Sequence, residues 1–188
     1  MYDHIQGKID RVKDNTVILS TFGIGYILYL PLNDSAELSE MIGTEIKLFT
    51  HYIHKEDNVT LYGFIKEESR DGFRTLIKVD GVGPKTALAM LSRHDIGVIY
   101  QSIENESVDV LKKTPGIGEK TAKKMILDLK GTINLLTINN LNQSDSDLVS
   151  AMISMGYNKN DVLKIYEKGK PFSGVFSDDI KKLLKLMV

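Results

Sequence analysis

The first third of the chain alternates between apolar and polar residues with the period of two that is typical of β-strands. Runs of this kind cover residues 5–11, 16–20, 26–30, 44–51 and 59–64. A short helix is expected over residues 35–41, with Asp34 as its capping residue. The last two runs flank the polar tip Lys55-Glu56-Asp57-Asn58. Five short strands separated by turns favour a small β-barrel of the OB-fold type.

After residue 64 the apolar spacing becomes helical, as in Phe73, Leu76 and Ile77, and later in Met125 and Ile126. The fold class is therefore α+β with several domains. A barrel is expected over residues 1–64, a helical domain over 65–136, and a linker over the polar stretch 137–147. The C-terminal domain, 148–188, is expected to hold three short helices, at 148–155, 161–167 and 177–187.

The helical region contains one ten-residue motif twice. Gly81-Val-Gly-Pro-Lys-Thr-Ala-Leu-Ala-Met90 and Gly116-Ile-Gly-Glu-Lys-Thr-Ala-Lys-Lys-Met125 agree at six of ten positions, 35 residues apart. Repetition within helical flanks indicates one supersecondary unit used twice. Neither copy is a Walker loop, because Pro84 or Glu119 precedes the lysine. Neither is a dinucleotide fingerprint, because the third glycine and the preceding strand are both missing.

A Gly-x-Gly turn between two helices can bind phosphate. Glycine tolerates a positive φ, and the first amides of the following helix are unpaired and point outward. A plain helix–helix connection is the alternative for a single copy, and two copies with Lys-Thr-Ala at the same offset argue against it. The predicted phosphate ligands are the four turn glycines and four lysines: Gly81, Gly83, Gly116, Gly118, Lys85, Lys120, Lys123 and Lys124. Such contacts would follow DNA shape and not base sequence.

Charge changes this picture only locally. The net charge of −1 over 188 residues excludes a polycationic protein that coats nucleic acid. Residues 112–130, however, hold six lysines against Glu119 and Asp128, and cations placed at phosphates largely set the affinity for DNA. By charge alone, a solvated helix face explains this stretch equally well.

These motifs resemble the RuvA family over the full length of the chain. The resemblance rests on Leu61-Tyr-Gly-Phe64, on the two glycine motifs with Pro115, and on Met155-Gly-Tyr157. It implies an OB-fold barrel, a tandem helix-hairpin-helix domain and a C-terminal three-helix (UBA-like) domain. It also implies a homotetramer, or two stacked tetramers, that holds a four-way (Holliday) junction open. The hexameric ATPase RuvB is the implied partner, and the resolvase RuvC a further one.

The resemblance assigns roles to other residues. Glu56 and Asp57 match the family's acidic pin, whose carboxylates repel phosphates at the centre of the junction. Without the resemblance, a polar turn explains them better. The chain departs from the family at Glu119, where a basic residue is frequent, and at Lys124, where arginine is usual. The positions that match the family's contact with RuvB are Met152, Met155, Tyr157 and Leu184, and core packing is the competing role for each of them.

No catalysis is expected from this chain. The histidines His4, His51, His54 and His94 have no metal-binding spacing, and the absence of cysteine excludes disulfides and thiolate sites. No cofactor or metal is expected. No membrane span or secretory signal is visible, so a cytoplasmic location is expected. Two alternatives remain open: a generic duplex-DNA-binding module, and a non-catalytic fragment of a nuclease or ligase system.

Overall fold

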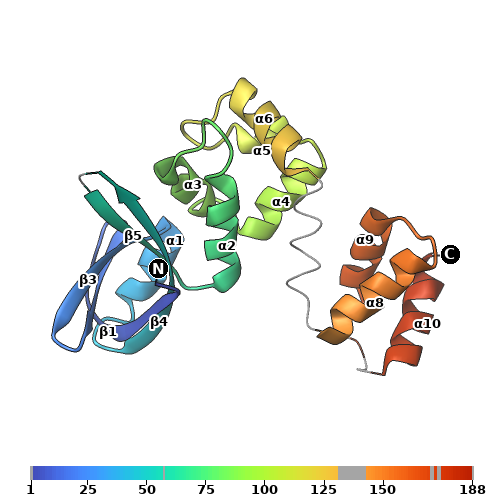
Figure 1. Ribbon diagram of the computed structural model, residues 1–188, viewed down its shortest axis with the longest axis horizontal. Helices are drawn as coiled ribbons and strands as arrows, with labels where there is room; N and C mark the ends of the chain where they lie inside the picture. The colour runs from blue at the N-terminus through green and yellow to red at the C-terminus, as the bar shows by residue number, and fades with distance from the viewer. Residues whose placement is uncertain (1, 57, 131–142, 170–171, 173–174, 188) are drawn as a thin grey trace. The chain divides into compact units, whose positions relative to one another are not determined.

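The computed structural model describes residues 2–56, 58–130, 143–169, 172 and 175–187. The chain divides into two compact units, Met1–Lys130 and Gly131–Val188, whose elements are labelled in Figure 1. The barrel expected from the sequence and residues 65–130 of the expected helical domain lie within the first unit, while residues 131–136 lie outside the described residues. None of the described helices is long and apolar enough to cross a lipid bilayer.

A closed five-stranded barrel forms the N-terminal part of the first unit, with strand order β1-β2-β3-β5-β4. Its strands are β1 (His4–Lys13), β2 (Thr16–Thr21), β3 (Ile24–Tyr29), β4 (Glu45–Lys55) and β5 (Asn58–Phe64). The alternation in sequence becomes an alternation of faces, because the inward residues of each strand build the core: Ile5, Ile9, Val17, Leu19, Leu28 and Leu48. The predicted barrel is confirmed.

The short helix of the barrel differs from its prediction. α1 (Leu32–Ser39) follows Pro31, starts three residues earlier than expected, and has no side-chain cap. Asp34 therefore lies inside the first turn and is not a cap, which corrects the prediction. Its carboxylate accepts the N–H of Ile65 at 3.1 Å and so ties α1 to the end of β5. Burial comes first among the causes that raise the pKa of Asp34.

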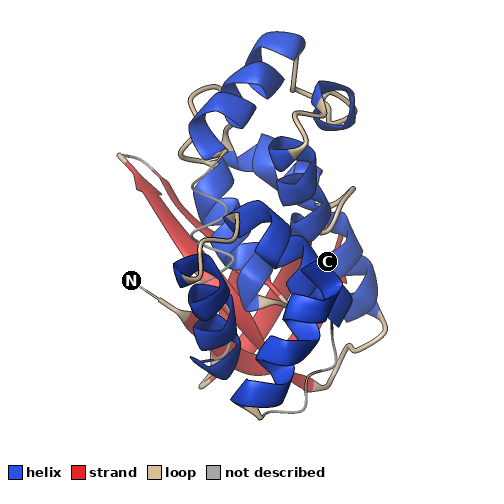
Figure 2. Ribbon diagram, turned by 90° about the vertical axis from the view of Figure 1, so that its right-hand side faces the viewer, coloured by secondary structure: helices blue, strands red, loops and turns tan. Residues whose placement is uncertain are grey.

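β4 and β5 form a hairpin that is longer than the sequence indicated. Their pairing runs from Phe49–Phe64 to Lys55–Asn58, so β4 continues four residues past His51. The far ends of both strands extend beyond the rest of the barrel (Figure 2). This extension carries the tip residue Glu56, which is exposed. Asp57 lies outside the described residues.

Five helices complete the first unit. They are α2 (Glu67–Leu76), α3 (Pro84–Leu91), α4 (Ile96–Glu104), α5 (Val108–Leu111) and α6 (Glu119–Leu129). α2 joins them to the barrel through Phe73, which is fully buried and packs its ring 4.9 Å from Tyr62 and 5.1 Å from Phe64. Near α3, the N–H of Leu32 donates to the Ser92 hydroxyl at 2.8 Å. These contacts fix the helices relative to the barrel.

A buried arginine strengthens the same junction. Arg70 of α2 is only 4% exposed, and its guanidinium pairs with Asp3 and Glu67 at 2.7 Å and with Asp71 at 2.9 Å. It also lies over the Phe49 ring of β4, 5.4 Å from the centroid. A buried guanidinium needs such partners because an unpaired charge is costly to remove from water. Arg70 thereby links the start of the chain, α2 and the barrel.

The described residues of the second unit form three helices, as predicted. They are α8 (Gln143–Ser154), α9 (Lys159–Gly169) and α10 (Phe176–Met187). Their core comprises Leu148, Val149, Met152, Val162, Tyr166 and Leu183. α8 begins at Gln143, so the predicted linker 137–147 is wrong for its last five residues. Its remaining positions lie outside the described residues.

Candidate nucleic-acid interface

The two copies of the repeat fold into the same helix-turn-helix connection. In each copy the first glycine, Gly81 or Gly116, has a φ of +89°, a conformation that side-chain-bearing residues rarely adopt. The second glycine, Gly83 or Gly118, is extended, with φ of −82° or −87°, and is the residue before the next helix. The motif therefore reverses the chain at its first glycine and starts a helix after its second.

The residue between the two glycines anchors each turn. Val82 and Ile117 are 3% and 5% exposed, while the four glycines around them are exposed. A Cβ added at Gly83 or Gly118 would meet nothing within 4 Å. The apolar residue thus points inward, and the glycine backbone on either side faces solvent.

Both turns end in helices whose first amides are free of the helical hydrogen-bond pattern. The first bonds of α3 and α6 run from Ala87 N–H to the Gly83 carbonyl and from Ala122 N–H to the Gly118 carbonyl, each at 2.9 Å. The amides before Ala87 and Ala122 lack such a partner within their helix. Together with the positive end of the helix dipole they can bind an anion.

The threonine of each copy packs against the turn of the other. A Cβ added at Gly116 would lie 3.4 Å from the Thr86 hydroxyl oxygen, and one added at Gly81 would lie 3.7 Å from the Thr121 methyl carbon. The contacts are reciprocal, because each turn packs against the threonine that follows the other turn. Sequence reasoning noted the identical threonines without assigning them this role; their presence in both copies was the available signal. The contacts hold the two glycine turns at a set spacing.

The four predicted lysines have different surroundings. Lys123 donates to Glu119 at 2.7 Å along α6, and Lys124 donates to Asp80 at 2.7 Å. Lys85 and Lys120, which follow the two turns, are exposed and have no ion-pair partner within the described part of the chain. Lys85 and Lys120 are therefore the cations most available to a phosphate.

Glu119, the acidic departure from the family pattern, is compensated by its neighbours. Its carboxylate bonds Lys123, and Lys112 lies 4.0 Å away. The hydrogen bond from Lys123 is the main cause that lowers the pKa of Glu119, followed by the charges of Lys123 and Lys112. Two cations around one carboxylate leave the start of α6 positive.

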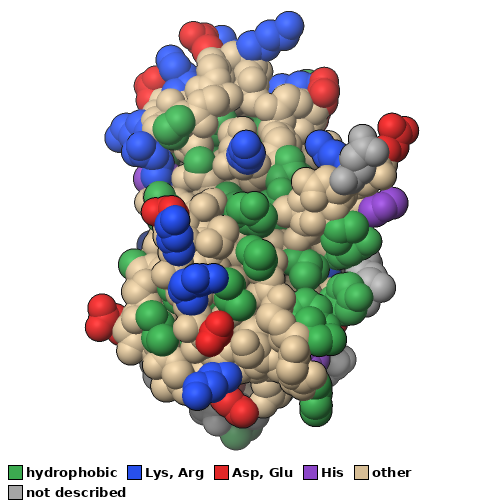
Figure 3. Space-filling view, turned by 90° about the vertical axis from the view of Figure 1, so that its left-hand side faces the viewer, with side chains coloured by type: hydrophobic (Ala, Val, Ile, Leu, Met, Phe, Trp, Pro, Cys, Tyr) green, Lys and Arg blue, Asp and Glu red, His purple; other side chains and the backbone are tan. Residues whose placement is uncertain are grey.

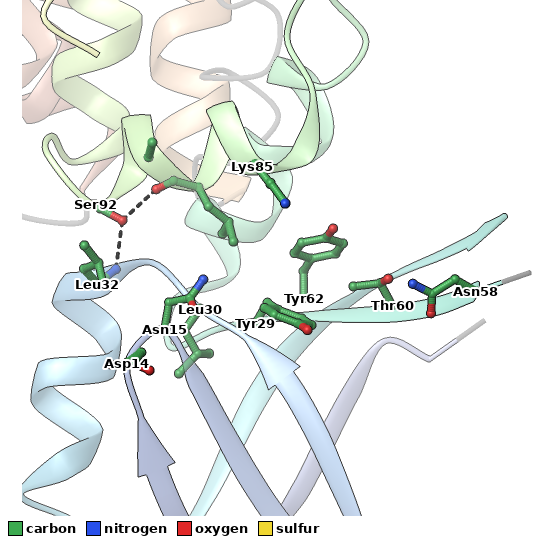
Figure 4. A pocket seen from close by; sticks show the side chains of 12 residues that line it. Asp14, Asn15, Tyr29, Leu30, Leu32, Asn58, Thr60, Tyr62, Lys85 and Ser92 are labelled. Atoms are coloured by element: carbon green, nitrogen blue, oxygen red, sulfur yellow. Dashed lines mark hydrogen bonds between the residues drawn. The ribbon is translucent and has the colours of Figure 1, made fainter. Parts of the chain in front are cut away.

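A cleft of about 680 Å³ lies between the barrel and α3. Figure 4 shows Lys85 reaching from α3 toward Tyr62, with Tyr29, Thr60 and Asn58 continuing along the barrel surface. The hydrogen bond between Leu32 and Ser92 joins the barrel to the end of α3 at this cleft. It extends the surface that begins at the first glycine turn.

The barrel also exposes apolar side chains. Figure 3 shows hydrophobic side chains gathered over its strands. Those of β3 and β5 include Ile24, Ile27 and Val59, which are all more than half exposed, and Tyr29. Contiguous exposed apolar residues on a small protein commonly mark a contact surface.

In the second unit the structure separates the four positions predicted to contact RuvB. Met155 and Tyr157 are 54% and 37% exposed. Met152, however, is fully buried, and Leu184 is half-buried against the same core. The assignment of Met152 to a contact surface is therefore wrong, because the three helices need its side chain for their interior; Leu184 is mainly a packing residue as well.

The described residues contain no group of three or more histidine or acidic side chains placed to hold a metal ion. His51 has a structural role instead. It accepts a hydrogen bond from Arg74 at 3.2 Å and packs against the ring of Phe73. Burial and then the charges of Arg74 and Arg70 lower its pKa. It supports the contact between α2 and the barrel.

Comparison with known proteins places these features in a family. Residues 1–63 match the model of the RuvA N terminal domain, and residues 73–131 match that of a SAM-like helix-hairpin-helix tandem. Similar proteins include the Holliday junction branch migration complex subunit RuvA of Thermodesulfovibrio yellowstonii, 36% identical over 89% of this chain and 87% of that protein. The proteins of the same name from Staphylococcus haemolyticus (37% identical over 88% of each) and Lactococcus lactis subsp. cremoris (31%, full length of both) are also similar.

Proposed function

This chain belongs to the RuvA family, and from that premise we propose that it binds four-way junction DNA and acts with RuvB in branch migration. Binding occurs through the sugar-phosphate backbone and not through base edges. The chain itself performs no catalysis, and the ATPase activity belongs to RuvB. Recombination and repair of DNA in the cytoplasm are the processes it serves.

One observation carries this proposal: two exposed glycine turns, each opening a helix and each followed by a lysine with no ion-pair partner among the described residues, lie in one compact unit. Gly81 and Gly83 with Lys85 form one anion site, and the corresponding residues of the second copy form the other. Two sites at a fixed spacing suit successive phosphates along a groove. Lys123 and Lys124 assist once they exchange their carboxylate partners for phosphate.

A preference for junctions separates this function from that of a generic duplex-binding module. We expect an unlabelled four-way junction to displace the protein from a labelled junction at a concentration at least about tenfold lower than linear duplex of equal length, because only the junction offers phosphates to all subunits at once. Competition measured by fluorescence anisotropy at a fixed salt concentration checks this. Equal competition by both DNAs would contradict the junction-specific function.

The tip of the β4–β5 hairpin supplies the acidic pin in this proposal. Glu56 is exposed at the end of an extended two-stranded ribbon, and Asp57 follows it in the sequence. A carboxylate brought close to the crossing strands repels their phosphates and keeps the duplex arms apart.

Changing Glu56 and Asp57 together to lysine is expected to alter the rate of RuvB-driven branch migration by about tenfold while leaving the melting temperature unchanged. The reason is that repulsion at the crossing becomes attraction, whereas the tip contributes nothing to the core. Strand-exchange assays on a mobile junction measure the rate. Charge-neutral changes at the same positions serve as the graded control, and an unaltered rate in the lysine variant would reject the pin.

Assembly into a homotetramer, or two stacked tetramers, completes the proposal. The exposed apolar residues of β3 and β5 support self-association, since apolar side chains gathered on one face would otherwise remain in contact with water. Met155 and Tyr157 offer an apolar surface for RuvB on the second unit. RuvC is a further partner, for which the open junction is the shared substrate.

A further inference from the structure

The two glycine turns differ in the residue that precedes the first glycine. Asp80 precedes Gly81, whereas the corresponding residue before Gly116 is Pro115. Lys124 of α6, the partner of Asp80, has Ala89 as its counterpart in α3. The ion pair between Asp80 and Lys124 therefore belongs to the first turn alone, although the turns are otherwise built alike.

This pair connects the first turn to the helix of the second. Lys124 donates to the Asp80 carboxylate at 2.7 Å, across 44 residues of sequence. Thr121, three residues earlier on the same helix and so on the same face, packs against Gly81. Lys124 thus lies beside the glycine amides that the first turn presents. The Asp80 side chain is 89% exposed and its core contribution is negligible.

Asp80 occupies groups that a phosphate would use. Lys124 is a cation beside the turn. The hydrogen bond from Lys124 and its charge are the main causes that lower the pKa of Asp80, and the backbone N–H of Gly81 lowers it by a smaller amount. A carboxylate and a phosphate are both anions that accept hydrogen bonds from ammonium and amide donors. Both cannot hold Lys124 and Gly81 fully at once.

The two turns hold their carboxylates differently. At the second turn, Glu119 is held by Lys123 and by Lys112, which also pairs with Asp109, and Lys120 remains unpaired among the described residues. At the first turn, Asp80 pairs with Lys124. An anion at the first turn must therefore displace Asp80 before Lys124 can bind it.

We propose that Asp80 is an internal competitor for DNA at the first glycine turn, and that Lys124 moves from the Asp80 carboxylate to a backbone phosphate when the junction binds. This inference rests on the proposed function and adds a residue that sets its affinity. By competing for Lys124, Asp80 lets the first turn release its phosphate more readily than it would without this carboxylate. Such release is useful to a protein past which DNA must move.

The test compares Asp80→Asn with the unmodified full-length chain in junction binding. Because a unit charge about 4 Å away in water changes an ionic equilibrium about fivefold, we expect the variant to bind about threefold to fivefold more tightly. The slope of log affinity against log salt concentration is expected to become steeper by about one. In the variant, the charge of Lys124 neutralises a phosphate, and no Asp80 carboxylate is left beside it. Asp80→Ala repeats the test without the amide, and thermal melting verifies that both variants fold.

A second substitution tests whether the effect runs through Lys124. Lys124→Gln is expected to weaken junction binding in both backgrounds, and to weaken it about threefold to fivefold more in the Asp80→Asn background, since only there does the lysine bind phosphate without first leaving a carboxylate. Glu106→Gln is the matched control: Glu106 pairs with Lys130, beyond the opposite end of α6, and its loss is expected to leave binding unchanged.

The outcomes distinguish this inference from the function beneath it. Unchanged or weaker junction binding by both Asp80 variants would overturn the competitor role while the unmodified chain still preferred junctions. Equal effects of Lys124→Gln in both backgrounds would overturn the exchange of partners. If the unmodified chain bound junction and duplex equally, the proposed function itself would fail, whatever the variants did.

Discussion

Replacing Lys85 and Lys120 together by alanine is expected to weaken junction binding by about a hundredfold. Each lysine follows a glycine turn with exposed amides and lacks an ion-pair partner among the described residues. A hydrogen bond between an ammonium and a phosphate contributes at least about tenfold in affinity when nothing else competes for the cation. The glycine amides remain, so the variant retains weak binding.

The same variant is expected to show a flatter dependence of affinity on salt. Each neutralised phosphate contributes about 0.9 to the slope of log affinity against log salt concentration, so two lost contacts lower the slope by about two for each bound chain. Titrations at several salt concentrations measure this. Lys168→Ala with Lys185→Ala removes the same charge from the second unit and serves as the control. A slope that stays unchanged in the Lys85 and Lys120 variant would mean that phosphates are bound elsewhere.

Replacing Met155 and Tyr157 by alanine is expected to abolish stimulation of the RuvB ATPase. Both side chains are exposed on either side of Gly156, which ends α8 with a φ of +92°, so neither is needed to hold the three-helix core. Large apolar side chains at the centre of an interface commonly contribute 2 kcal/mol or more each. Losing two such anchors weakens docking by about a thousandfold.

The measurement is ATP hydrolysis by RuvB in the presence of junction DNA and increasing amounts of the variant. Junction binding by the variant itself is expected to stay unchanged, since the glycine turns lie in the other unit. Leu186→Ala, an exposed apolar residue near the end of α10, is the control for loss of surface hydrophobicity. Continued stimulation by the Met155 and Tyr157 variant would locate the RuvB contact elsewhere. If the second unit is deleted to test the same contact, the chain should be cut before α8, because a cut at Asp147 would divide that helix.

Much of the fold follows from local patterns. The alternating runs predicted the five strands because a strand with one buried face must repeat every two residues. The helices of the first unit were predicted from spacing near 3.6. The predicted ends were less accurate, as in the starts of α1 and α8, because helix boundaries depend on capping contacts that periodicity does not report.

Assignments that required knowledge of burial had mixed outcomes. Met152 and Met155 are both apolar and three residues apart, yet Met152, within α8, is in the core, and Met155, just after the end of α8, faces solvent. Apolar spacing identifies the candidates for a buried face without saying where α9 and α10 cover it. Asp34 similarly had the composition of a cap, and its carboxylate instead bonds Ile65, 31 residues away.

The two glycine turns could be predicted from the sequence alone, because a positive φ at Gly81 and Gly116 and the start of a helix after Gly83 and Gly118 are properties of a few adjacent residues. The pairing of the nearby lysines was decided only in three dimensions. Lys85 has no ion-pair partner among the described residues while Lys124 meets Asp80, since the packing of α6 against the first turn brings together side chains that are 44 positions apart. Local conformation is encoded in neighbouring residues, but the pairing of charges depends on distances that only the folded chain sets.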